Sequence, residues 1–143
     1  MNELTNPFIG NWTYYSFQNN PDLGPDPTTI PLFAFATLTF TDAPMGQVKG
    51  TIGTAGSWIL DLEGWITYGD PYTARFQGKG NIQGAPWIYD YECYYVKHWP
   101  NGVDQVEALV GSLIRTIPHP GGEQAGLVAS FYAVRQSPIV PSS

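Results

Sequence analysis

Residues 72–99 read YTARFQGKGNIQGAPWIYDYECYYVKHW, and the pattern of this stretch indicates the fold class most clearly. From Tyr72 to Gln83, apolar side chains and glycines fall at even positions, whereas polar and charged side chains fall at odd ones. A period of two indicates a β-strand with one buried face and one exposed face. Residues 84–86, Gly-Ala-Pro, are a turn signal, and residues 87–99 form a second, aromatic run. The stretch therefore predicts two antiparallel strands joined by a short turn.

Comparable runs rich in β-branched and aromatic residues recur along the chain, separated by segments rich in glycine and proline. They predict further strands at residues 8–17, 32–41, 47–53, 57–68, 105–117 and 126–135. The run 105–117 also fits a helix, because Val106, Leu109, Val110 and Leu113 share one helical face. Its central Gly111 and its β-branched residues favour a strand.

About eight short strands joined by turns predict an all-β domain. A meander of this size closes naturally into an up-and-down barrel, which removes the exposed sheet edges. A two-sheet sandwich is the alternative. We expect a single domain over residues 1–143, with loose termini at 1–7 and 136–143, and a proline-rich rim or lid at 18–31.

Composition narrows the classes of partner. The formal net charge is −6, and Lys and Arg form no cluster, which argues against binding to nucleic acid or to an anionic membrane. A single cysteine, Cys93, excludes an intramolecular disulfide. The chain opens on no signal-peptide pattern and has no transmembrane-length apolar run, so we expect a cytoplasmic protein, although a chain trimmed of its signal would look the same.

Three short features resemble the calycin barrels, the group of lipocalins, fatty-acid-binding proteins and avidins. They are Gly10-Asn11-Trp12 on the first strand, Tyr89-Asp90-Tyr91, and Arg135 near the end of the last strand, with Arg115 as a second candidate for that basic residue. The resemblance implies that the tryptophan plugs one end of the barrel and that the arginine packs across it. The chain lacks the C-terminal helix of lipocalins, the helical lid of fatty-acid-binding proteins and the polar biotin cluster of avidins.

The aromatic strand offers two interpretations. One face carries Trp87, Tyr89, Tyr91, Cys93 and Tyr95, and would be either the wall of a ligand cavity or a packed core or subunit interface. Asp90 and Glu92 lie on the opposite face. Inside the barrel they would share a proton and could support acid–base chemistry, but we favour the exterior because the partner face is so apolar.

Arg115 stands in an otherwise apolar run. It could bind a carboxylate or polarise a carbonyl, but we favour an exterior or rim position paired with an acid such as Glu107. The two histidines, His98 and His119, together with Cys93 do not make a metal site. The glycine-rich segments lack the lysine and the following helix of a phosphate loop. We therefore expect neither metal nor cofactor.

The leading hypothesis is a barrel that binds a small, largely apolar, aromatic or polyketide-like molecule. Its expected ligand-binding residues are Trp12, Tyr14, Phe33, Phe35, Trp58, Phe76, Tyr89, Tyr91 and Arg115. A cyclase or isomerase on the same barrel is the first alternative, with Tyr91, Arg115, Glu92 and His98 as catalytic candidates. The second is a homo-oligomerising module with a filled core and exposed interface aromatics.

Overall fold

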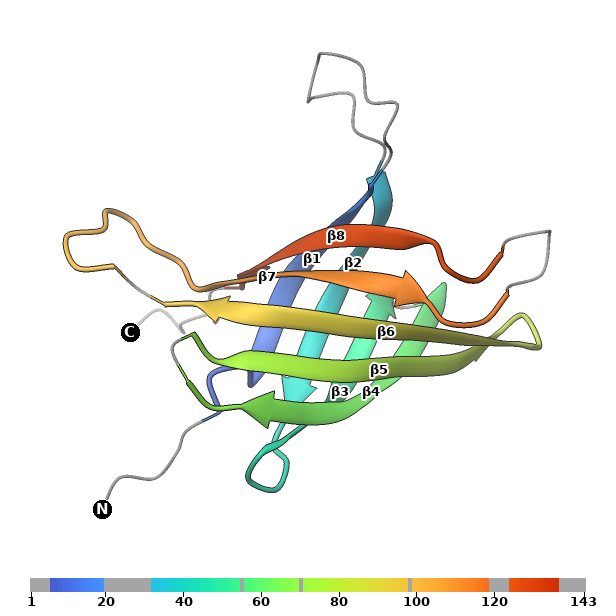
Figure 1. Cartoon of the computed structure of the whole chain (residues 1–143), viewed down its shortest axis with the longest axis horizontal. Helices are drawn as coiled ribbons and strands as arrows, with labels where there is room; N and C mark the ends of the chain where they lie inside the picture. Colours follow the sequence, from blue (N-terminus) through green and yellow to red (C-terminus); the bar gives the residue numbers. More distant parts are fainter. Residues whose placement is uncertain are drawn as a thin grey trace, which may run out of the picture.

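The computed structural model is a closed antiparallel β-barrel (Figure 1). It describes residues 6–19, 32–54, 56–69, 71–97, 99–118 and 124–136. The strands are β1 Gly10–Gln18, β2 Leu32–Thr41, β3 Gln47–Thr54, β4 Trp58–Thr67, β5 Thr73–Ile82, β6 Ala85–Val96, β7 Ala108–Arg115 and β8 Val128–Arg135.

Every strand pairs with its neighbour in the chain, and β8 pairs with β1 to close the sheet. Figure 1 shows β5 to β8 crossing in front of β1 to β3, as the two walls of a barrel do. The prediction of an up-and-down barrel is confirmed, and the sandwich alternative is wrong. Within the described ranges, no helix is long and apolar enough to cross a membrane.

Most strand boundaries differ from the predicted ones by one to three residues, and two of the differences have a clear local cause. Gln83 and Gly84 both have positive φ, 54° and 80°, and together make a two-residue hairpin turn, so β6 already begins at Ala85. The run predicted from residue 105 is a strand rather than a helix, but it begins only at Ala108. The Gln105 side chain instead closes the preceding loop, where its Nε2 donates to the Trp99 carbonyl at 2.7 Å.

The inner face of β2 differs from the expectation that Phe33 and Phe35 share the cavity side. Ala36, Leu38 and Phe40 are the buried residues of this strand, so Phe35 faces outward. A β-bulge reverses the alternation at the start of the strand: Ser16 is opposite Ala34, but Phe17 is opposite Leu32. The extra residue, Phe33, turns inward and packs against the core.

One end of the barrel is closed by an aromatic plug. Trp12 is fully buried, and its Nε1 donates to the Phe8 carbonyl at 2.9 Å. The ring of Phe8 lies edge-on to Phe40, at 6.1 Å between centroids, and to Tyr95, at 6.3 Å. These contacts fill the end at which β1 begins and β6 ends.

Arg135 lies across this plug, as the resemblance implied. Its guanidinium is 4.3 Å from the centroid of Trp12, and its Nε is 2.7 Å from a carboxylate oxygen of Glu107. Nη1 donates to the Ile9 carbonyl at 2.7 Å. Gly10 is required here, because it has φ +132° and a Cβ at this position would collide with the Arg135 guanidinium. The closed end is thus a bonded unit that joins the first and last strands.

Candidate functional site

The opposite end of the barrel contains a cavity of about 490 Å³. It lies where β2, β4 and β6 begin and where β5 and β7 end. Its lining residues are Tyr14, Phe33, Ala34, Phe35, Ser57, Trp58, Ile82, Gln83, Trp87, Tyr89, Tyr91 and Arg115. Pockets of about 300 to 1,000 Å³ hold small organic ligands.

Aromatic rings from two strands build one wall of this cavity. Tyr89 is central, because Phe33 meets it edge-on at 6.1 Å and 81°, and Trp87 meets it at 6.3 Å and 75°. Tyr91 follows at 6.3 Å from Tyr89 and 55°. Edge-to-face pairs expose both ring edges and ring faces, so this wall can receive a second aromatic system by either geometry.

The floor of the cavity is closed. The rings of Phe76 and Tyr91 are stacked at 5.0 Å with 10° between their planes. Gly78 makes this packing feasible, because a Cβ there would lie 3.1 Å from the Tyr91 ring and 3.2 Å from Leu62. The inner glycine of β5 therefore admits the tyrosine ring of the neighbouring strand, and the space above Tyr91 becomes the cavity.

Arg115 is inside the barrel, with 6% of its surface exposed, so the favoured exterior or rim position is wrong. It follows Leu109 and Leu113 on the inner face of β7. Its guanidinium carbon is 5.7 Å from the Phe33 centroid, and Nη1 donates to the Gln124 carbonyl at 3.2 Å. Glu107, the acid expected to pair with it, holds Arg135 instead. Among the described residues that line the cavity, Arg115 is the one with a formal charge.

The buried phenols are neutral hydrogen-bonding groups. Burial raises the pKa of Tyr91 well above its ordinary value and also raises the pKa of Tyr14. Both hydroxyls are therefore protonated at neutral pH and can donate to a ligand but cannot act as bases. Burial likewise raises the pKa of the Cys93 thiol to about 12, which makes it a poor nucleophile.

The cavity brings together most of the residues predicted to bind ligand: Tyr14, Phe33, Trp58, Tyr89, Tyr91 and Arg115. Phe76 supports the floor from below. Trp12 lies at the closed end instead. Phe35 borders the mouth, but it is 52% exposed and its ring packs on Tyr15 of the outer face, at 5.0 Å.

Two of the four catalytic candidates, Tyr91 and Arg115, line the same cavity. Glu92 is on the outer face, where it pairs with Arg75 at 3.3 Å, as expected from the apolar character of the partner face. His98 lies outside the described residues. Trp87 also lines the cavity but was not among the residues predicted to bind ligand, although its alternation with Tyr89 and Tyr91 indicates this position.

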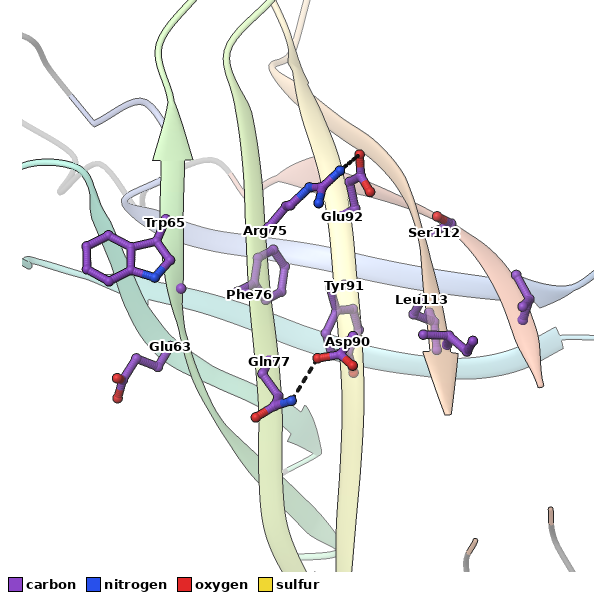
Figure 2. Close-up of a pocket in the computed structure, with 13 residues that line it drawn as sticks. Glu63, Trp65, Arg75, Phe76, Gln77, Asp90, Tyr91, Glu92, Ser112 and Leu113 are labelled. Carbon is purple, nitrogen blue, oxygen red and sulfur yellow. Dashed lines mark hydrogen bonds and ion pairs between the residues drawn. The ribbon is translucent and has the colours of Figure 1, made fainter. Parts of the chain in front are cut away.

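A second hollow, of about 610 Å³, lies on the outer surface across β4 to β8 (Figure 2). Its polar side chains bond to one another. Gln77 Nε2 donates to Asp90 at 2.8 Å, and Thr116 donates to the same carboxylate at 2.7 Å. Figure 2 shows the Gln77–Asp90 and Arg75–Glu92 pairs side by side on β5 and β6. The end cavity, with its aromatic wall and buried arginine, is the stronger candidate site.

The chain matches no protein-family model, no curated protein and no solved structure. Its class is therefore defined by geometry: an eight-stranded up-and-down barrel in which the described residues plug one end and line a cavity at the other, consistent with a calycin-like fold. In the described part of the chain, no three His, Cys, Asp or Glu side chains come together as a metal site. His98 and His119 are not among the described residues.

Proposed function

We propose that this protein is a calycin-like barrel that binds a small, largely apolar, aromatic molecule in its end cavity. The observation that carries the proposal is the cavity of about 490 Å³ with aromatic side chains from four strands, β1, β2, β4 and β6, and one buried arginine. A core filled to ordinary protein density would leave few voids larger than a water molecule. A space of this size, lined by rings, is characteristic of a ligand site.

The residues that line the cavity favour a ligand of particular chemistry. A flat ring system fits against Phe33, Trp87 and Tyr89, which together offer apolar edges and faces. Arg115 favours a hydrogen-bond acceptor, such as a carbonyl or carboxylate, on the part of the ligand that lies near Phe33. The protonated Tyr91 hydroxyl supplies a second, uncharged donor. The ligand is thus an aromatic body with at least one acceptor oxygen.

Native mass spectrometry of protein purified from its own host, followed by fluorescence titration, tests this function. We expect a co-purified small molecule, and saturable quenching by a planar aromatic carboxylate, because Trp58 and Trp87 line the cavity. Bound molecules recovered unchanged identify a carrier, whereas recovered products of ring closure or isomerisation identify an enzyme. A chain that carries nothing and shows only linear, non-saturating quenching contradicts the proposal.

A matched pair of variants locates the binding. Phe33→Ala removes an inward ring and should weaken binding about tenfold, the effect of roughly 1.4 kcal/mol. Ile59→Ala truncates a side chain that is 47% exposed on the outer face beside Trp58 and does not line the cavity, and it should leave the affinity within about twofold. Equal effects of the two substitutions would place the ligand elsewhere.

A further inference from the structure

The outer surface of the barrel divides into two halves of different chemistry. On β3 to β6, outward positions of neighbouring strands pair opposite charges: Lys49 is opposite Glu63, and Asp61 is opposite Lys79. The Arg75–Glu92 pair continues this pattern onto β6 (Figure 2). All carboxylates that the described strands point outward lie on β4 and β6, namely Asp61, Glu63, Asp90 and Glu92.

The other half consists of β7, β8, β1 and β2, which are adjacent because the barrel is closed. The outward-facing residues of these strands are Asn11, Thr13, Tyr15, Phe17, Leu32, Phe35, Thr37, Thr39, Thr41, Val110, Ser112, Ile114, Val128, Ser130, Tyr132 and Val134. None of them carries a charge. Arg115 and Arg135, the charged residues of these four strands, point to the two ends of the interior instead.

A continuous row of side chains crosses the uncharged half and ends on β6, the neighbouring strand of the charged half. Tyr15 is opposite Phe35 on one side and Tyr132 on the other. Val110 follows opposite Tyr132, and Tyr94 of β6 is opposite Val110. We call Phe35, Tyr15, Tyr132, Val110 and Tyr94 the aromatic row. Its four rings are between 39% and 52% exposed.

The exposed rings of the aromatic row offer about half of the area that a stable interface buries per partner. A fully accessible aromatic side chain exposes roughly 200 Å², so four half-exposed rings offer about 400 Å². Leu32, Ile114 and Val128, which are 40% to 52% exposed, extend the same surface. A stable interface buries about 800 Å² per partner, whereas a monomer rarely exposes apolar patches of more than a few hundred Å².

We propose that the uncharged half docks a second copy of this chain, with the aromatic row at the centre of a two-fold interface. The chain carries a formal charge of −6, so two copies repel wherever their carboxylates approach. Meeting through β7, β8, β1 and β2 keeps the carboxylates of β4 on the far sides of the dimer and leaves those of β6, which pairs with β7, at the edge of the interface. A surface without charge is also complementary to itself, as a two-fold interface requires.

The mass in solution, measured by light scattering or sedimentation over a concentration series, tests this proposal. Wild-type protein should show twice the chain mass of 15.7 kDa. Tyr132→Glu places a carboxylate at the centre of the row, twice in each dimer, and should weaken association at least about 100-fold. Trp65→Glu is the matched control, because Trp65 is 65% exposed on the charged half, and it should leave the dimer intact.

Further measurements separate loss of docking from loss of folding. Tyr15→Ser truncates a second ring of the row and should also shift the mass toward the monomer, while circular dichroism and the melting temperature stay near those of wild type. Raising salt from about 0.02 M to about 0.5 M should strengthen the wild-type dimer, because salt screens the repulsion between acidic copies. A monomeric wild type, or Trp65→Glu dissociating as readily as Tyr132→Glu, overturns the proposal.

Discussion

At each end of the barrel an arginine packs near an aromatic ring, but the side chains around the two arginines are packed differently. At the closed end, Arg135 lies 4.3 Å above Trp12 and bonds to Glu107 and to the Ile9 carbonyl. At the cavity end, Arg115 lies 5.7 Å from Phe33, beside a volume of about 490 Å³. The same pair of residue types thus seals one end and lines a cavity at the other.

Packing, rather than residue type, thus distinguishes an arginine that closes one end of the barrel from an arginine that lines a cavity at the other. At the closed end, the buried side chains of Phe8, Trp12 and Phe40 pack together as a plug. At the other end, the bulge in β2 and the two-residue turn before β6 set aromatic side chains around a space. We therefore expect substitutions at the closed end to change stability, and substitutions at the cavity end to change ligand affinity.

The largest effect should come from Trp12→Ala. Removing a fully buried tryptophan should cost about 3 to 5 kcal/mol of unfolding free energy, measured by denaturant titration. Trp58→Ala at the cavity end removes a partly exposed indole and should cost about 1 kcal/mol, while it weakens ligand binding. Equal stability losses at the two ends would show that the cavity end is packed as a core.

The next largest effects are expected from substituting the two arginines, one on stability and the other on ligand affinity. Arg135→Gln leaves Glu107 partly buried without its cation and should cost about 2 kcal/mol, below the 3 to 5 kcal/mol of a fully buried pair. Arg115→Gln should instead reduce the affinity for an aromatic carboxylate at least about tenfold, because a charge-assisted hydrogen bond contributes roughly 1.5 to 3 kcal/mol. The comparison fails if the neutral amide analogue of that ligand loses as much affinity as the carboxylate.

The smallest expected effect is on the pH dependence of the unfolding free energy. It arises from Cys93, which lies between the two ends of the barrel. Burial raises the pKa of Cys93 from 9.0 to about 12, so the folded state holds the thiol proton more tightly than the unfolded state. Its stabilising contribution is complete below pH 9 and is lost as pH rises toward 12. The unfolding free energy of the wild type should therefore decline as pH rises from neutral to 10, and Cys93→Ala should make this decline smaller by about 1 kcal/mol, since one pKa unit corresponds to about 1.4 kcal/mol.

A thiol-reactive dye provides the control for that prediction. Cys93 should resist labelling in the folded protein at pH 8 and react fully after denaturation, because the side chain is buried. Rapid labelling of the folded protein would show that the layer beneath the cavity opens to solvent, and the assignment of the alkaline decline to Cys93 would then be wrong.

Local patterns predicted the inner faces of β4, β5 and β6, because strict alternation sorts side chains before any partner strand is known. The same rule misassigned Phe35, since a single extra residue in β2 shifts the register beyond Ser16. It also misplaced Arg115 on the exterior or rim, because both faces of β7 are apolar: Leu109 and Leu113 face inward, whereas Val110 and Ile114 face outward.

The sequence by itself determined the number of strands, their order as a meander and the aromatic character of β6. These follow from side-chain period and turn chemistry, which act over a few residues. The positions of the two arginines, one at the plug and one at the cavity, are visible only in the tertiary structure. The same is true of the uncharged outer half. Both depend on β8 closing against β1, a pairing between residues more than a hundred positions apart that no local pattern records.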